Sequence, residues 1–383
     1  MKIQTIHDIN EYVGTTINPL NSPDTIYELY SVPSFDLDYP EVLHGNEIGS
    51  SKVTVEENDI LVCKINPRIN RVWIVKHHTK HQLIASSEWV IIRSPKNDAR
   101  YLCYYFQSPA FRTLINSGLT GIGGSLTRAQ PKQIAKYPVP LPGIETQQCI
   151  ADTLDKLQSI ITHRKQQLEK LDELVKARFV EMFGDPVTNP MGWDIVNISE
   201  VISGKVSNGF FAKRDEYCDD GNVGILGVVN VVNRMYSNIV ALPRTNATDK
   251  DIEKYEVKYG DMLFCRSSLV AEGIGKASIV PEDASKKILF ECHVIRLPLD
   301  LNKCVPEFMQ VQSTTGFFRN QVISQSKTAT MTTIGQDGIL KTNIILPPIE
   351  RQYSFYDFIK QTNKSKFIAN HMNKEYKTNG VLK

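Results

Sequence analysis

The sequence predicts an α+β protein with two similar mixed α/β domains in a pseudo-twofold arrangement, separated by long helices. Two observations predict this architecture: the chain repeats itself after about two hundred residues, and a run of seven-residue apolar spacing lies between the two copies. With 383 residues, 41% hydrophobic and 22% charged, the chain can bury two cores. The predicted division is a first domain at 1–143, a first helix at 144–185, a second domain at 186–347, and a second helix with its tail at 348–383.

The internal repeat consists of four matches in the same order, at offsets from 202 (260 minus 58) to 207 (318 minus 111). The matching segments are 58–63 with 260–265, 91–93 with 294–296, 111–112 with 318–319, and 141–147 with 346–352. Solenoid repeats run roughly 20 to 50 residues, so each copy should be a domain with its own core. Within each copy, β-branched runs bounded by turn residues predict strands, and a helix is expected near 101–116 and 306–324.

The segment from Glu145 to Phe183 has the spacing of a coiled coil. Its predicted seam residues are Leu154, Leu157, Ile161, Leu168, Leu171 and Val175. At 1.5 Å per residue, a helix of this length would be roughly 58 Å long. An ordinary amphipathic core helix is the alternative, but such a long helix with polar faces needs a partner helix. The candidate partner runs from about Ile349 to Tyr376, with Phe367, Ile368 and Met372 among its apolar contacts.

Composition sets limits on function. Forty-four Lys and Arg oppose 42 Asp and Glu, giving a net charge of +2, so any nucleic-acid footprint must be local. The amino terminus has no apolar signal core and no stretch has the length of a membrane span, which predicts a cytoplasmic protein. The seven cysteines show no CxxC spacing, so neither a disulfide framework nor a zinc site is expected.

A local cationic surface is predicted in the first copy, because no Asp or Glu lies between Ile60 and Ser87, and none lies between Ala99 and Ile144 around the loop at 121–125. Basic side chains displace counterions from phosphates, and amides can pair with base edges. The candidate DNA-binding residues here are Lys64, Asn66, Arg68, Asn70, Arg71, Lys76, His77, His78, Lys80 and Arg128.

The second copy has weaker equivalents, which are Lys213, Arg214, Asn230, Arg234, Arg266, Ser267, Lys276 and Lys327. Any one of these charge runs, taken alone, is more often a solvated face. The group His77, His78 and His81 could also be a metal site, but its neighbours predict two strands joined by a basic turn and no helix, which favours a contact loop.

Catalytic motifs are not found in the sequence. There is no phosphate-binding loop, no nucleophile elbow, no His-Glu-x-x-His helix, and no methyltransferase Asn-Pro-Pro-aromatic run. Asp249 and Asp251 before Glu256-Val257-Lys258 have the residue order of a metal-dependent nuclease, but the spacing is tight and the first copy carries no acid or lysine at the equivalent position. We therefore expect neither catalysis, nor a metal, nor a cofactor in this chain.

The chain resembles the DNA-specificity subunits of Type I restriction-modification systems. The resemblance lies in Gly49-Ser50-Ser51-Lys52 ahead of Asp59-Ile60-Leu61, the junction Leu141-Pro142-Gly143-Ile144-Glu145-Thr146-Gln147, and Arg178-Phe179-Val180-Glu181-Met182-Phe183-Gly184-Asp185-Pro186 followed by Gly192-Trp193. It implies two target-recognition domains that read the halves of an asymmetric bipartite site, and two helices in an antiparallel coiled coil.

The same resemblance implies partners: two methyltransferase subunits, which carry S-adenosylmethionine, and restriction subunits, which use ATP and Mg. Two other interpretations remain open at this point. One is a DNA-modifying or DNA-cleaving enzyme with an unrecognised active site. The other is a coiled-coil scaffold with no role in DNA binding.

Overall fold

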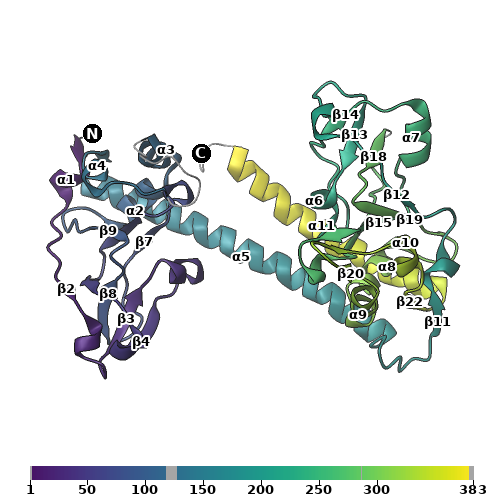
Figure 1. Ribbon diagram of the computed structural model, residues 1–383, viewed down its shortest axis with the longest axis horizontal. Helices are drawn as coiled ribbons and strands as arrows, with labels where there is room; N and C mark the ends of the chain where they lie inside the picture. The colour runs from purple at the N-terminus through teal and green to yellow at the C-terminus, as the bar shows by residue number, and fades with distance from the viewer. Residues whose placement is uncertain (1, 118–126, 286, 379–383) are drawn as a thin grey trace. The chain divides into compact units, whose positions relative to one another are not determined.

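The computed structural model describes residues 2–117, 127–285 and 287–378, with the backbone alone for 365–378. By its contacts the chain divides into two units, one formed by 1–164 with 376–383 and the other by 165–375. The division falls inside one continuous helix, which Figure 1 shows in teal. The domain boundaries given by the sequence repeat stay a prediction, because this division is one of contacts alone.

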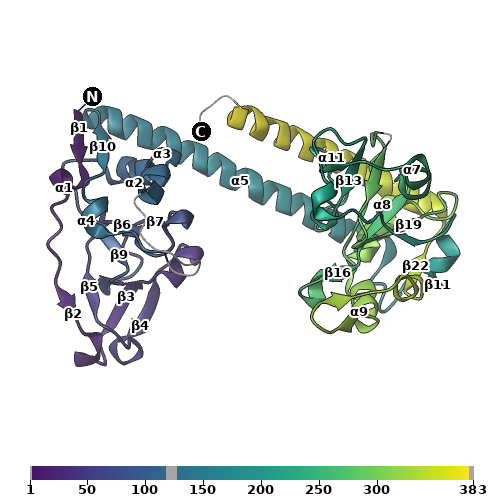
Figure 2. The ribbon, with the colours of Figure 1, turned by 45° about the horizontal axis from the view of Figure 1, so that its top comes forward.

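The first unit contains three sheets and four short helices ahead of the long one (Figure 2). A five-stranded sheet has the order β2 (Thr16–Ile17), β5 (Lys52–Thr54), β8 (Gln82–Ala85), β3 (Ile26–Tyr30) and β4 (Glu41–His44). The two smaller sheets are β7 (Val72–Ile74) with β6 (Ile60–Cys63) and β9 (Trp89–Ile92), and β1 (Lys2–Thr5) with β10 (Pro138–Leu141). The helices are α1 (Ile6–Ile9), α2 (Ala99–Gln107), α3 (Pro109–Ser117), α4 (Pro131–Ile134) and α5 (Ile144–Phe183).

The second unit contains four sheets. The largest has the order β12 (Ser207–Asn208), β19 (Val294–Pro298), β15 (Asp261–Cys265) and β17 (Ala277–Ile279). Two three-stranded sheets have the orders β14 (Arg244–Thr245), β13 (Val223–Leu226), β18 (Ile288–Phe290) and β16 (Ser267–Ser268), β21 (Thr332–Thr333), β20 (Lys327–Thr328). The last pairs β11 (Asp194–Asn197) with β22 (Asn343–Leu346). The helices that follow the end of α5 are α6 (Val228–Val231), α7 (Asp249–Tyr255), α8 (Pro306–Ser313), α9 (Gly316–Ser324), α10 (Gln336–Leu340) and α11 (Ile349–Thr378).

Strand pairing confirms the internal repeat. β6 pairs with β7 and β9 as β15 pairs with β17 and β19, and β3 lies parallel to β8 as β13 lies parallel to β18. The predicted offset of 203 for one match is wrong, however, because Cys63 pairs with Trp89 whereas Cys265 pairs with Val294, which gives 205 (294 minus 89). A shift of two residues keeps every side chain on the same face of a strand, so two alternating apolar strands match equally well in either register.

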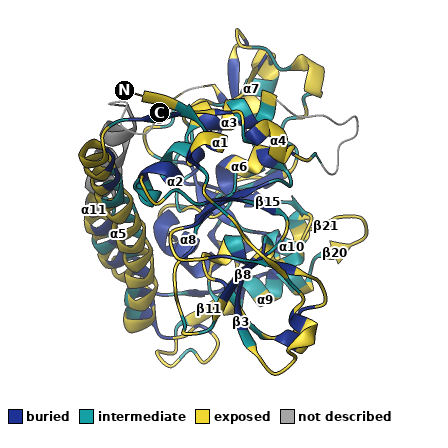
Figure 3. Ribbon diagram, turned by 90° about the vertical axis from the view of Figure 1, so that its left-hand side faces the viewer, coloured by how far each residue is buried: buried dark blue, intermediate teal, exposed yellow. Residues whose placement is uncertain are grey.

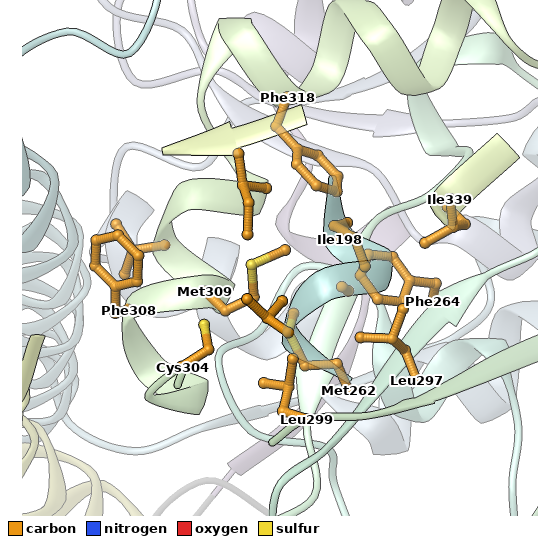
Figure 4. Close-up of a cluster of buried hydrophobic side chains, with 14 of the residues drawn as sticks. Ile198, Met262, Phe264, Leu297, Leu299, Cys304, Phe308, Met309, Phe318 and Ile339 are labelled. Carbon is orange, nitrogen blue, oxygen red and sulfur yellow. The ribbon is translucent and has the colours of Figure 1, made fainter. Parts of the chain in front are cut away.

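Each unit has its own core. In the second unit, Met262, Phe264 and Leu297 of the sheet pack against Phe308 and Met309 of α8 (Figure 4). In the first unit, the β6, β7 and β9 sheet packs against α2 and α3 through a separate cluster that includes Phe106 and Phe111. Buried residues in Figure 3 follow β8 and β15, whereas α5 is largely exposed.

Helix α5 confirms the predicted helix, beginning one residue earlier at Ile144 and ending at Phe183. Of the predicted seam residues, Val175 is buried, and Leu154, Leu157, Ile161, Leu168 and Leu171 are half-buried. Within the second unit, α5 and α11 run antiparallel, since the ring centroids of Phe183 and Phe355 lie 5.5 Å apart and Arg178 stacks over Phe358 at 5.7 Å. The expected seam side chains Phe367, Ile368 and Met372 lie outside the described side chains.

A buried glutamine fixes the start of each long helix. The side chain of Gln147 accepts a hydrogen bond from the Asp98 N–H at 3.0 Å, and donates to the Pro142 carbonyl at 2.9 Å. Gln352 does the same in the second unit, accepting from the Val305 N–H at 2.9 Å and donating to the Pro347 carbonyl at 2.8 Å. We call these two side chains the glutamine clamps. Each one ties a long helix both to the first turn of α2 or α8 and to the strand that precedes the long helix.

Replacing Gln147 by Leu should lower the thermal stability of the first unit. The change leaves the N–H of Asp98 and the carbonyl of Pro142, both on half-buried residues, without their side-chain partner, at a cost of about 1 to 3 kcal/mol. We expect the unfolding midpoint of this unit to fall by about 5 to 10 °C in calorimetry. Gln158→Leu, an exposed position on the same helix, is the control and should change it little; equal shifts for the two variants would show that the clamp contributes nothing.

Candidate nucleic-acid interface

Some of the basic residues predicted in each copy lie on one equivalent turn. In the first unit this turn joins β6 to β7 and runs from Lys64 to Arg71, and in the second it joins β15 to β17 and runs from Arg266 to Lys276. The same backbone hydrogen bond closes the turn in both units. The N–H of Cys63 donates to the Arg71 carbonyl at 3.0 Å, and that of Cys265 to the Lys276 carbonyl at 2.8 Å. We call them the duplicated turns, and each begins and ends on a cation.

A second segment lies beside each duplicated turn. The carbonyl of Lys64 accepts from the Ala129 N–H at 2.9 Å, and that of Arg266 accepts from the Ile334 N–H at 3.1 Å. This pairing places Arg128 next to the first turn. It also places the hairpin of β20 and β21, with the exposed Lys327, next to the second. The predicted loop at 121–125 lies outside the described residues.

The side chains of the first turn differ in their freedom to bind DNA. Arg68 is exposed, and Asn66 is half-buried with a left-handed backbone (φ +47°). Lys64 donates to the Ser87 carbonyl, and Arg128 forms an ion pair with Glu88 at 3.0 Å. The Asn70 side chain is already engaged, because it donates to the Phe106 carbonyl at 3.0 Å, whereas Arg71 makes only a long contact of 3.8 Å with the exposed Asp36.

The predicted single cationic surface is two surfaces. Lys76, His77, His78 and Lys80 are exposed, but they lie on the loop between β7 and β8, at the opposite end of β7 from the duplicated turn. This loop folds around the buried carboxylate of Glu28, which accepts from the N–H groups of His78 and Thr79 at 3.0 and 2.8 Å. The sequence could not show this, because Glu28 comes from outside the acid-free run.

Metal ligation has no support in the geometry. Within 2–117, 127–285 and 287–364, no group of three or more His, Cys, Asp or Glu side chains is arranged to hold a metal ion. Asp251 instead caps α7 by accepting from Thr248, and those hydrogen bonds lower the pKa of its carboxyl. Glu256 accepts from the Lys287 N–H at 2.7 Å, so this carboxylate too has a structural partner.

The remaining second-copy candidates fall into three places. Lys213 and Arg214 are exposed on a short turn remote in sequence from the others. Asn230 is buried; its side chain accepts from the Gly227 N–H at 3.0 Å and donates to the Asn238 carbonyl at 3.1 Å, which gives it a structural role. Lys276 donates to Asn233 at 2.8 Å, and it lines a cavity together with Arg234.

That cavity has a volume of about 390 Å³, and α5 forms one of its walls. Lys176 of α5 and Arg319 of α9 line it beside Arg234 and Lys276, so four basic residues share it with one acid, Asp172. Arg319 matches Arg112 in the sequence repeat, and burial lowers the pKa of its guanidinium. Lys176 was missed by sequence reasoning, because a single lysine on a heptad helix carries no signal of its own.

Two further findings concern the whole described chain. All seven cysteines are free thiols, four of them buried. Among the helices of the described residues, none has both the length and the apolar character needed to cross a membrane.

Comparison with known proteins finds DNA-specificity subunits of Type I restriction systems. Residues 6–172 match the family model of the Type I restriction modification DNA specificity domain. The Type I restriction enzyme StySPI specificity subunit of Salmonella potsdam is 24% identical over 278 residues, 68% of this chain and 58% of that subunit. The MjaVIII specificity subunit of Methanocaldococcus jannaschii is 21% identical over 327 residues, 82% of this chain and 74% of that subunit. The match to the StySPI subunit thus covers less than two thirds of its length.

Solved structures show the same fold. A chain from a study of complex assembly and conformational transition of the type I restriction-modification system superposes with a TM-score of 0.56 at 14% identity, covering all of this chain and 96% of that one. The Type I restriction-modification S subunit from M. genitalium gives 0.51 at 10% identity, covering 98% and 94%. In sequence over 6–172 and in fold over nearly its whole length, this chain is similar to Type I restriction-modification specificity subunits, as its sequence resemblance predicts.

Replacing Glu28 by Gln should loosen the loop between β7 and β8. The carboxylate of Glu28 accepts from two N–H groups and the Thr79 hydroxyl, and the variant replaces it by a neutral amide with one accepting oxygen. Hydrogen bonds to a charged acceptor, worth about 1.5 to 3 kcal/mol each, are thereby lost or weakened. We expect the amide protons of His78 and Thr79 to exchange with solvent at least about tenfold faster, measured by NMR or mass spectrometry. Glu57→Gln, on an exposed residue of the same unit, should leave both rates unchanged. Unchanged exchange in the Glu28 variant would contradict the assigned role.

Proposed function

We propose that this chain is the DNA sequence-specificity subunit of a Type I restriction-modification complex, and that it binds an asymmetric bipartite DNA site. The observation that carries the proposal is the duplicated turn, which starts and ends on a basic residue at equivalent positions of both copies. Two copies of one basic element within a single chain suit two separate contacts on one duplex, as the paired half-sites of dimeric DNA-binding proteins do.

In this proposal the phosphates supply affinity and the base edges supply sequence. Lys64 and Arg71, and likewise Arg266 and Lys276, would neutralise phosphates, while side chains of the turn interiors would meet the bases. The proposal assigns 1–143 and 186–347 as target-recognition domains, and 144–185 and 348–383 as spacer helices. The two turn interiors differ in sequence, which favours an asymmetric target.

The proposal makes this chain non-catalytic. Its relatives are named specificity subunits of restriction enzymes, and the partners we infer are two methyltransferase subunits, which supply S-adenosylmethionine, and restriction subunits, which use ATP and Mg. Its compartment would be the cytoplasm. The competing proposal, a DNA-modifying or DNA-cleaving enzyme, has no cluster of catalytic side chains among the described residues to support it.

The decisive experiment is to express the chain with and without its cognate methyltransferase subunit, and to map adenine methylation on random duplex DNA. We expect methylation at one bipartite sequence, and only when both components are present. Methylation or cleavage by this chain alone, or methylation without sequence preference by the pair, would refute the proposal.

Salt dependence gives a second prediction, for the residues of the first turn. In a complex with the methyltransferase subunit, alanine at Lys64, Arg68 and Arg71 together should weaken binding and flatten the plot of log affinity against log salt by about 0.9 for each lost phosphate contact. The control is Lys96→Ala, which removes an exposed lysine that pairs with Glu11 beyond the far end of β9. A slope that stays equal to wild type in the triple variant would remove the first turn from the interface.

A further inference from the structure

The tip of each duplicated turn exposes aliphatic side chains. Ile69 in the first turn is 54% exposed, and Leu269 and Val270 in the second are 82% and 58% exposed. None of the three belongs to a hydrophobic cluster of the described residues. A single exposed aliphatic residue is common on protein surfaces and needs no explanation. Here the same feature occurs at the same place in both copies.

The surroundings of these side chains point to a nucleic-acid partner. Each tip lies between two cations that the backbone frame makes equivalent, Lys64 and Arg71 in the first turn, Arg266 and Lys276 in the second. Cations at both ends of a turn that bind phosphates would bring the tip between them toward the groove. The second interior carries one acid, Glu272, which is exposed and disfavours close approach of this tip to a phosphate.

Both tips are held in a defined conformation. In the first turn, Asn66 and Asn70 adopt left-handed backbone angles (φ +47° and +55°), and Asn70 is anchored to the Phe106 carbonyl at 3.0 Å. In the second, the Ser268 hydroxyl accepts from the Val270 N–H at 3.3 Å. Ordered backbone limits the entropy lost on binding, as a recognition element requires.

The two duplicated turns share the backbone hydrogen bonds at their ends but differ in the residues between their cations. Six residues (65–70) lie between the cations of the first turn, and nine (267–275) lie between those of the second. The cations at the ends agree in charge, whereas length and sequence of the interior differ. Divergence confined to the tips is what two elements need if they use one docking geometry to read different base sequences.

We propose that Ile69, and Leu269 with Val270, are specificity-determining residues that contact the 5-methyl group of thymine in the major groove, one set in each half-site. This inference rests on the proposed function. Among the base edges of the major groove, thymine presents this methyl group as its apolar feature, while the other groups are hydrogen-bond donors and acceptors. An aliphatic side chain placed on those polar groups would leave them unsatisfied, which costs free energy.

The test uses the full chain in complex with its methyltransferase subunit, once methylation mapping has given the target. Duplexes in which deoxyuridine replaces one thymine at a time, which removes only the methyl group, are compared in competition binding at fixed salt. With the wild-type complex, at least one replacement in each half-site should weaken binding about fourfold, the effect of one buried methyl group. Ile69→Ala should abolish this sensitivity in one half-site, and Leu269→Ala with Val270→Ala in the other.

Two matched variants control for the loss of an exposed aliphatic side chain. Val13→Ala and Val187→Ala, at positions 88% and 64% exposed, should keep the wild-type response to deoxyuridine. Two outcomes would overturn this inference and leave the proposed function standing. One is sequence-specific binding that no deoxyuridine replacement weakens, and the other is an unchanged effect of deoxyuridine in the tip variants. Absence of any sequence-specific binding or methylation would overturn both.

Discussion

The glutamine clamps are the interaction on which the rest of the architecture depends. Each buried amide group satisfies, at once, an N–H at the start of α2 or α8 and a carbonyl just after β10 or β22. Asp98 and Pro142 are half-buried, and Val305 and Pro347 are buried, so loss of the glutamine would leave their N–H and carbonyl groups without a protein partner.

Beyond the clamps, the two modules hold their helices by different chemistry. Since the clamps bind Asp98 and Val305, Arg100 corresponds to Glu307. Arg100 forms ion pairs with Asp152 and Asp155 of α5 at 2.8 Å each. Glu307 is instead buried, accepts from the Tyr236 hydroxyl at 2.9 Å, and has its pKa raised by burial.

In the second unit, aromatic side chains hold α5 in place of ion pairs. The rings of Phe179 and Phe183 on α5 lie 5.6 and 4.9 Å from Phe308. Ion pairs thus hold α5 to the first unit, and aromatic side chains hold it to the second. Among the predicted seam residues of α5, only Val175, near its carboxyl end, is fully buried. The duplicated sequence therefore conserves the clamp and leaves the supporting contacts free to diverge.

Sequence reasoning succeeded where the signal is local. The helix at 144–183 was predictable because the heptad run ends at Gly184, whose φ of +75° suits glycine. The cations of the first turn were found because an acid-free run marks them. It failed where the deciding partner is distant in the sequence. Glu28 binds the loop of Lys76 to Lys80 and so separates it from the turn, and the Asn238 carbonyl accepts from the amide of Asn230. The register shift at Val294 was visible only in the strand pairing.

The construction of the duplicated turns has a consequence for how such a protein can evolve. Their frame is made of main-chain hydrogen bonds, which residues of almost any kind can form, and their tips lie outside both cores. Substitutions or length changes at the tips therefore cost little stability. Under the proposed function, a lineage acquires a new recognised sequence by altering a few exposed residues, with no compensating change in the fold.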